Sequence, residues 1–194
     1  MRLASLFLCL LLVPALGISQ QSGNAVASPG LRARVTTNVG NFVIELDRGR
    51  APLTVDAFVK YAKQGFYSGL IFHRVVAGFI AQGGGYTPDL TMKAVVANVP
   101  NESGNGLSNL RGTVGFARSN EPHSGTSQFY VNLADNLDLN PRATRWGYAV
   151  FGKVVEGMEV VDDIGHRPTG PGGPFDRNVP VQPITIQSVE ILGE

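Results

Sequence analysis

The chain contains a single cysteine, Cys9, which lies in an apolar stretch close to the N-terminus. Without that stretch the chain can form no disulfide bond and offers no thiol nucleophile, and a cysteine-free composition suits an oxidising compartment. Charged residues are also scarce, because they make up only 16% of the chain. The 16 basic and 15 acidic residues nearly balance and form no basic run, so we expect no nucleic acid partner.

The motifs of several common enzyme classes are missing. The three histidines lack the spacing of a zinc site, and the glycines Gly83–Gly85 lack the Lys-Ser/Thr pair of a phosphate-binding loop. Ser127, His123 and Asp135 are the residue types of a hydrolase triad, but no nucleophile-elbow glycine frame surrounds the serine. We therefore expect no metal and no cofactor, and the hydrolase interpretation is weak.

The first 27 residues have the features of a secretory signal peptide followed by a polar leader. Arg2 supplies a positive charge, Leu3 to Val13 forms an apolar core too short to span a bilayer, and Ala15-Leu16-Gly17 is a small-x-small cleavage site. Residues 25–27 offer a second cleavage site. We predict cleavage near residue 17 or 27, a periplasmic or secreted location and no membrane attachment afterwards; an uncleaved anchor is the alternative.

Residues 31–193 have the patterning of one all-β domain. The 24 glycines and 12 prolines indicate many turns, and a hydrophobic content of 43% is enough for a core. Alternating runs predict about eight strands, at residues 31–39, 41–46, 72–76, 91–96, 111–118, 128–132, 147–155 and 184–191. Helical spacing predicts two helices, at residues 55–64, where Thr54 can cap the helix, and at residues 158–164. Surface loops are expected at residues 98–109 and 168–183.

The expected strands do not alternate with helices, as the strands of a parallel sheet would. A closed barrel leaves no strand edge exposed. We therefore predict a closed eight-stranded antiparallel β-barrel capped by two α-helices.

The stretch from Phe72 to Gly85 places a charged side chain inside an apolar run. With the two-residue period of a strand, Arg74 lies on the face opposite His73, which we expect to be structural or exposed. A guanidinium buried without a partner costs several kcal/mol, so Arg74 either pairs with a carboxylate or serves a ligand. A glycine then breaks the strand, which allows Phe79 and Gln82 to return to the same surface. The three closing glycines indicate positive φ or a close approach.

Three blocks of sequence follow one another in a recognisable order. They are Phe72–Gly85 with the pattern F-H-R-x-x-x-G-F-x-x-Q-G-G, Arg111–Arg118 followed by Ser127–Asn132, and Gly147–Met158. Together they resemble the cyclophilin family of peptidyl-prolyl cis-trans isomerases, and the resemblance extends from about Arg34 to Leu192. It implies the same barrel fold and an enzyme that accelerates rotation about X-Pro bonds in proline-containing polypeptides, here most like the exported bacterial group that assists protein folding.

The resemblance also assigns roles to individual residues. Arg74 would be the catalytic residue, and Gln82 would orient it and contact the substrate backbone. The proline pocket would be lined by Phe79, Ile80, Tyr130 and Leu139. The rest of the substrate-binding surface would consist of Ala117, Arg118, Gln128 and Tyr148.

Three residues depart from the family pattern. Tyr130 replaces the usual phenylalanine and adds a hydroxyl to the pocket floor, and Arg118 replaces the usual asparagine, which affects a contact with the peptide backbone. Asp138 stands where many members carry a tryptophan that helps to bind cyclosporin. We therefore expect weak or no cyclosporin binding, and we expect a monomer. The alternatives are a proline-peptide-binding chaperone module with little turnover and a lipocalin-like barrel, which the arginine and glycine pattern disfavours.

Overall fold

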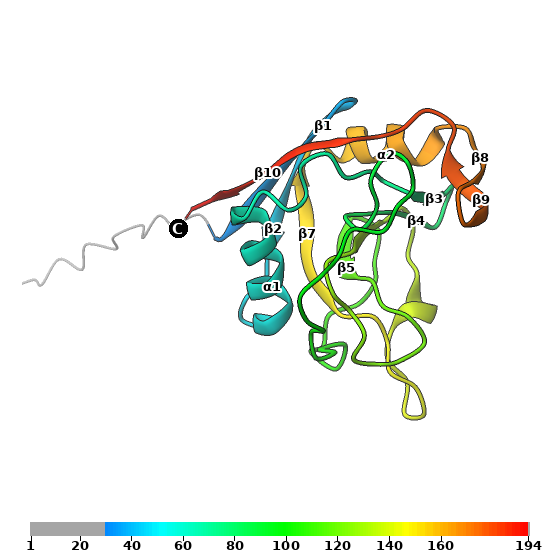
Figure 1. The fold of residues 1–194 in the computed structure, drawn as a ribbon. Helices are drawn as coiled ribbons and strands as arrows, with labels where there is room; N and C mark the ends of the chain where they lie inside the picture. Colours follow the sequence, from blue (N-terminus) through cyan, green and yellow to red (C-terminus); the bar gives the residue numbers. More distant parts are fainter. Residues whose placement is uncertain (1–29, 194) are drawn as a thin grey trace, which may run out of the picture.

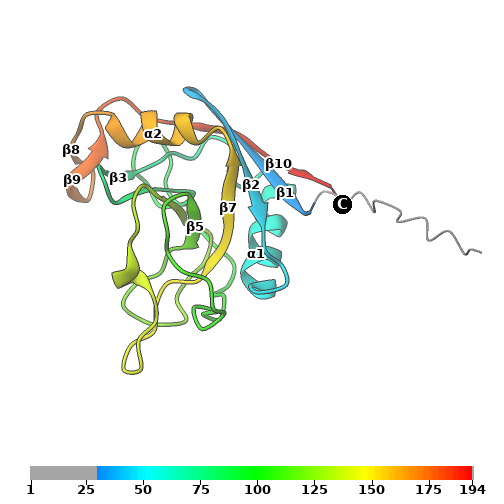
Figure 2. The same cartoon turned by 180° about the vertical axis from the view of Figure 1, so that it is seen from behind.

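A computed structural model describes residues 30–193, and Figures 1 and 2 show it from opposite sides. The predicted signal peptide and both predicted cleavage sites lie outside the described residues. No helix among residues 30–193 is long and apolar enough to cross a membrane.

Most of the strands form one antiparallel sheet of eight strands in the order β10-β1-β2-β7-β5-β6-β4-β3. The strands are β1 (Arg32–Thr37), β2 (Gly40–Leu46), β3 (Arg74–Val76), β4 (Ile80–Gly83), β5 (Thr113–Phe116), β6 (Phe129–Asn132), β7 (Val150–Glu156) and β10 (Ile186–Leu192). The mainly-β class and the two strands predicted at residues 31–39 and 41–46 are confirmed, and β1 and β2 pair as an antiparallel hairpin.

The sheet curls into a half-barrel, so the predicted closed barrel is not confirmed (Figure 1). Within residues 30–193, the edge strands β3 and β10 do not pair with each other. The segment before β3 approaches the other edge instead, and the backbone N–H groups of Gly69 and Phe72 donate to the carbonyls of Ile186 and Ile184, both at 2.9 Å. A single bridge between Ile71 and Thr185 joins the two edges, and in the part of the chain that the structure describes no longer strand ladder continues across the gap.

The two predicted helices are present as α1 (Pro52–Lys63) and α2 (Met158–His166). Phe58 of α1 is fully buried, and its ring lies 5.3 Å from the rings of Tyr67 and Phe151 and 5.6 Å from that of Phe129. Aromatic pairs at such distances add to the stability gained from area burial. The helix is therefore held to the sheet by one aromatic cluster.

Three local predictions were wrong. Residues 168–183 contain a hairpin, β8 (Thr169–Gly172) and β9 (Phe175–Pro180), instead of a loop. Residues 91–96 form no strand, because only Met92 makes a single bridge, to Tyr86. Thr54 does not cap α1, because the helix begins two residues earlier and Glu102 accepts hydrogen bonds from the backbone of its first turn.

Candidate active site

The β3–β4 hairpin brings the central predicted residues together. Arg74 lies opposite Gln82 in the strand register, and the connecting turn contains Gly78 at a φ of +67°. That φ favours glycine, which has no Cβ to clash. The guanidinium carbon of Arg74 lies 5.9 Å from the centroid of the Phe79 ring. The predicted return of Phe79 and Gln82 to the surface of Arg74 is therefore confirmed.

A chain of side-chain hydrogen bonds orients the arginine. Nη1 of Arg74 donates to Oε1 of Gln82 at 3.3 Å, and Nε2 of Gln82 donates to Oε1 of Gln128 at 2.9 Å. Arg74 forms no ion pair with any carboxylate among residues 30–193. Its positive charge is therefore available to a ligand.

The surroundings of Arg74 disfavour its charged form only partly. Burial lowers the pKa of Arg74 from its ordinary value, and the charge of Arg177 acts in the same direction, while Tyr148 opposes both. An arginine has so high a pKa that it stays protonated in proteins. The site therefore presents a permanent, half-buried cation.

Each of the three glycines after Gln82 has a structural reason. Gly84 has a φ of +81°, which favours glycine. A Cβ on Gly83 would lie 3.1 Å from the carbonyl oxygen of Ile71, and one on Gly85 would lie 2.5 Å from Cγ of Gln128. The prediction of positive φ or close approach is confirmed, and Gly85 leaves the space in which Gln128 reaches Gln82.

The hydroxyl that Tyr130 was predicted to add to the pocket floor has a partner within the fold. It is buried and donates to Oδ1 of Asn109 at 2.7 Å. Burial raises the pKa of Tyr130 well above its ordinary value, so the phenol stays neutral. The ring fits because a Cβ on Gly115 would lie 2.2 Å from Cζ of Tyr130. Asn109 therefore accepts the hydrogen bond of the added hydroxyl, and Gly115 leaves room for the tyrosine ring.

The sequence gives no sign of the role of Asn109. This residue lies in the segment predicted to be a surface loop, but it is 0% exposed. Its backbone N–H donates to Oδ1 of Asn140 at 2.8 Å, and its Nδ2 donates to the carbonyl of Tyr148 at 3.3 Å. Asn109 therefore connects Tyr130 to two other segments around the site. No spacing in the sequence distinguishes it from the other asparagines of the same loop.

The second and third sequence blocks meet around Tyr148. The guanidinium carbon of Arg118 lies 4.5 Å from the centroid of the Tyr148 ring, and the ring of Tyr130 lies 6.1 Å from it. The backbone N–H of Tyr148 donates to the carbonyl of Leu139 at 2.9 Å, and that of Ala117 donates to the carbonyl of Gln128 at 2.9 Å.

The other residues predicted to line the proline pocket differ in exposure. Ile80 is only 4% exposed, whereas Phe79 and Leu139 are half-buried. Nδ2 of Asn136, from the loop before Leu139, donates to the carbonyl of Phe79 at 2.8 Å. The predicted site residues therefore lie on linked strands and loops, while their individual roles stay predictions.

The suggested hydrolase triad is not assembled. Oγ of Ser127 donates to the carbonyl of Gly84, Nδ1 of His123 accepts from the backbone of Asn101, and Asp135 accepts from the backbone of Arg111. No group of three or more potential metal ligands occurs in the described part of the chain.

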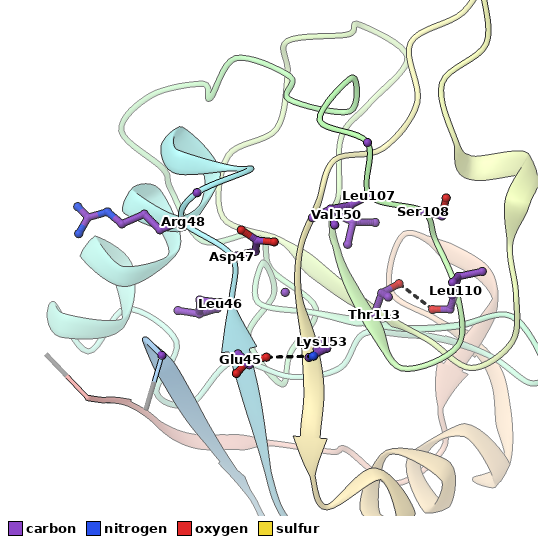
Figure 3. A pocket seen from close by; sticks show the side chains of 14 residues that line it. Glu45, Leu46, Asp47, Arg48, Leu107, Ser108, Leu110, Thr113, Val150 and Lys153 are labelled. Atoms are coloured by element: carbon purple, nitrogen blue, oxygen red, sulfur yellow. Dashed lines mark hydrogen bonds and ion pairs between the residues drawn. The ribbon is translucent and has the colours of Figure 1, made fainter. Parts of the chain in front are cut away.

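A separate hollow of about 570 Å³ lies between β2, β7 and the loop at residues 106–110 (Figure 3). It contains the ion pair between Glu45 and Lys153, with the carboxylate oxygen and Nζ 3.1 Å apart. None of the predicted site residues lines this hollow.

Comparison with known proteins agrees with this arrangement. Residues 32–191 match the family model described as cyclophilin type peptidyl-prolyl cis-trans isomerase/CLD. Peptidyl-prolyl cis-trans isomerase A of Dickeya dadantii is 47% identical over 180 residues, covering 93% of this chain and 94% of that protein. Peptidyl-prolyl cis-trans isomerase B of Escherichia coli is 45% identical, covering 80% of this chain and 96% of that protein.

Solved structures show the same relationship. A cyclophilin type peptidyl-prolyl cis-trans isomerase of Cryptosporidium parvum has a TM-score of 0.72 at 26% identity, covering 84% of this chain and 98% of its own. A second structure of that protein, in the presence of the dipeptide Ala-Pro, has a TM-score of 0.71 at 27% identity, with coverages of 84% and 99%.

Proposed function

The chain belongs to the family of cyclophilin-type peptidyl-prolyl cis-trans isomerases, and from this premise we propose that it accelerates rotation about X-Pro bonds in exported proteins and so assists their folding. The enzyme class itself follows from the family match and from relatives that are 45% to 48% identical. The proposal concerns the substrates, the residues that act on them and the cellular compartment in which the enzyme works.

The observation that carries the proposal is a fixed guanidinium that has no carboxylate partner among residues 30–193. Rotation about the X-Pro bond meets a barrier of about 18 to 20 kcal/mol, because resonance gives that bond partial double-bond character. Arg74, held by Gln82, can donate a hydrogen bond toward the prolyl nitrogen and so draw its lone pair out of resonance. This chemistry needs no acid-base step, metal or nucleophile.

The guanidinium accounts for only part of the acceleration. A charge-assisted hydrogen bond contributes about 1.5 to 3 kcal/mol, which corresponds to roughly one to two powers of ten in rate. We assign the remainder to a desolvated pocket, lined by Phe79, Ile80, Tyr130 and Leu139, that is complementary to the twisted bond.

The proposal predicts a large loss of activity when the guanidinium is removed. Arg74→Ala should lower kcat/KM for a proline peptide roughly 10- to 150-fold, because the lost hydrogen bond contributes about 1.5 to 3 kcal/mol. The rate is measured by exchange NMR, which reports rotation without an auxiliary protease. Arg74→Lys, which keeps the charge but loses the planar fork, should also be strongly impaired.

The matched control is Arg48→Ala, because Arg48 is an exposed arginine paired with Asp56. It should keep the wild-type rate. Unchanged activity in Arg74→Ala would reject the role of Arg74. If wild-type protein bound proline peptides without accelerating exchange, the proline-peptide-binding chaperone module would be the better description.

The proposal places the mature protein in the periplasm or outside the cell, as the features of residues 1–27 suggest. The alignment with the Dickeya dadantii relative covers 93% of this chain and so includes residues that precede residue 32. Cell fractionation followed by N-terminal sequencing tests this, and we expect a mature N-terminus after residue 17 or 27. A chain recovered intact in the cytoplasm would contradict it.

We also propose weak cyclosporin binding by a monomer. Asp138 is 91% exposed through its side chain and pairs with Arg142, so this position offers a charged, solvated surface. The chain's tryptophan, Trp146, instead lies with its ring 5.1 Å from that of His123. Inhibition in the nanomolar range would contradict the expected micromolar or weaker binding.

A further inference from the structure

Three arginines, here called the arginine rim, surround the proposed site: Arg74, Arg118 and Arg177. Within residues 30–193 none of them forms an ion pair with a carboxylate within 4.0 Å. Arginines elsewhere on the surface do so, as Arg34 does with Glu190 at 3.0 Å. The rim therefore concentrates uncompensated positive charge.

Arg118 is held rigidly on one side of the site. Its Nε donates to the carbonyl of Gly147 at 3.1 Å and its Nη2 donates to that of Trp146 at 2.8 Å. Its Nη1 donates to the carbonyls of Ser119 and Asn120 at 2.9 and 3.3 Å. Carbonyl oxygens orient the guanidinium but do not cancel its charge, because they carry only partial charges. Arg118 thus presents a fixed cation against the Tyr148 ring.

Arg177 approaches from the other side, on β9. This strand packs against β3, which carries Arg74 (Figures 1 and 2). The ring of Phe175 lies 5.6 Å from that of His73, the residue before Arg74. The charge of Arg177 lies close enough to Arg74 to lower the pKa of that guanidinium. Arg177 is exposed and extends the rim toward solvent.

Nearby acidic residues do not neutralise the rim. Asp138 is paired with Arg142. Neither Asp176, beside Arg177, nor Glu121, in the loop that Arg118 contacts, lies within 4.0 Å of a guanidinium nitrogen of the rim. The charge of the whole chain cannot explain the rim either, because Arg2 is the only charged residue in the predicted leader and its removal leaves equal numbers of basic and acidic residues.

We propose that the arginine rim selects proline segments flanked by aspartate or glutamate. This inference rests on the proposed isomerase function and names its preferred substrate class. Positive clefts attract acidic ligands and raise their rate of association, and like charges across an interface are repelled. Acidic flanks are therefore favoured and lysine flanks are disfavoured at the same X-Pro bond.

The test uses three blocked peptides with one Ala-Pro core, flanked on both sides by Glu, Gln or Lys. At low ionic strength we expect kcat/KM for the Glu peptide to exceed that for the Lys peptide about 3- to 10-fold, because exposed charge pairs contribute modestly. The ratio should fall toward one at about 1 M salt, where the screening length is about 3 Å.

Two substitutions locate the effect. Arg118→Gln and Arg177→Gln should each reduce the ratio of Glu to Lys rates, and the double variant should bring it close to one. Arg34→Gln, which changes the net charge equally but lies on β1, should keep the wild-type ratio. A ratio that falls as much in Arg34→Gln as in the rim variants would assign the effect to net charge and overturn the inference.

The outcomes separate this inference from the proposed function. If the wild type accelerates rotation in the Gln peptide but treats the Glu and Lys peptides alike, the preference is rejected and the isomerase function stands. If it accelerates none of the three peptides, the proposed function fails, and the inference fails with it.

Discussion

At the scale of the residue, Tyr130 and Gly115 form one unit. The Tyr130 ring occupies the volume that any side chain at position 115 would need, with Cζ 2.2 Å and Oη 2.3 Å from the Cβ position. The hydroxyl of Tyr130 donates a hydrogen bond to Oδ1 of Asn109, and Nδ2 of Asn132 donates to the same oxygen at 3.2 Å. A tyrosine in place of phenylalanine is therefore matched by a glycine below it and a buried amide beyond it.

This unit predicts the effect of one added methyl group. Gly115→Ala should displace the Tyr130 ring and break its hydrogen bond to Asn109, which costs about 1 to 3 kcal/mol for an overpacked core. Because Tyr130 is a predicted pocket residue, kcat/KM should fall as well. Urea unfolding and the peptide assay measure the two effects.

The control is Gly104→Ala, because a Cβ on Gly104 would meet no atom within 4 Å. It should change neither stability nor activity measurably. Wild-type stability in Gly115→Ala would show that the Tyr130 ring can move without cost.

Residues near Arg74 could be predicted because several local patterns agree there. The strand period separates Arg74 from His73, and the glycine after the strand returns Phe79 to it. Asn109 could not be predicted, because its role depends on segments that meet only in the folded chain. His73, expected to be structural or exposed, is 2% exposed because its ring packs against Tyr86 and Phe175, which the strand period could not show.

At the scale of the element, the N-terminus of α1 depends on a distant loop. Oε1 of Glu102 accepts from the backbone N–H of Leu53 at 3.1 Å, and its Oε2 accepts from the backbone N–H and the hydroxyl of Thr54 at 2.8 and 2.7 Å. A carboxylate also interacts favourably with the positive end of the helix dipole. Glu102 thus performs the capping role predicted for Thr54.

Glu102→Ala should therefore destabilise the protein by about 1 to 3 kcal/mol, because the first turn of α1 loses its acceptors. Hydrogen exchange of the amides of Leu53 and Thr54 should become faster than in the wild type. The exposed Glu121 provides the control, and Glu121→Ala should leave both measurements unchanged. Equal protection of these amides in Glu102→Ala would contradict the capping role.

Helices and strands with a strong hydrophobic period were predicted from the sequence. The β8–β9 hairpin, which is stabilised by contacts with residues distant in the sequence, was not. The β1–β2 hairpin and both helices follow from alternation and helical spacing. The β8–β9 hairpin is rich in glycine and proline, and it is positioned by Phe175, whose ring packs 5.1 Å from that of Tyr86. Tyr86 lies far from this hairpin in the sequence, so no local pattern could indicate the hairpin.

At the scale of the whole molecule, the half-barrel places His73 between the sheet and the β8–β9 hairpin. Its ring lies 4.5 Å from that of Tyr86 and 5.6 Å from that of Phe175. Burial lowers the pKa of His73 from its ordinary 6.5 to about 4, and the charge of Arg74 acts in the same direction. The folded chain therefore keeps this histidine neutral at a pH where the unfolded chain protonates it.

The free energy of unfolding should consequently depend on pH in a defined direction. Above about pH 6.5, His73 is neutral in both the folded and the unfolded chain. As the pH falls to about 4, only the unfolded chain binds a proton at His73. The free energy of unfolding therefore decreases by up to about 3 kcal/mol. His73→Gln should flatten the curve of unfolding free energy between about pH 4 and pH 6.5. The control is the exposed His166, and His166→Gln should keep the wild-type slope. Urea unfolding at half-unit steps of pH measures the three curves. Parallel curves for the wild type and His73→Gln would mean that the folded protein admits the proton, and that the hairpin does not seal this histidine from water.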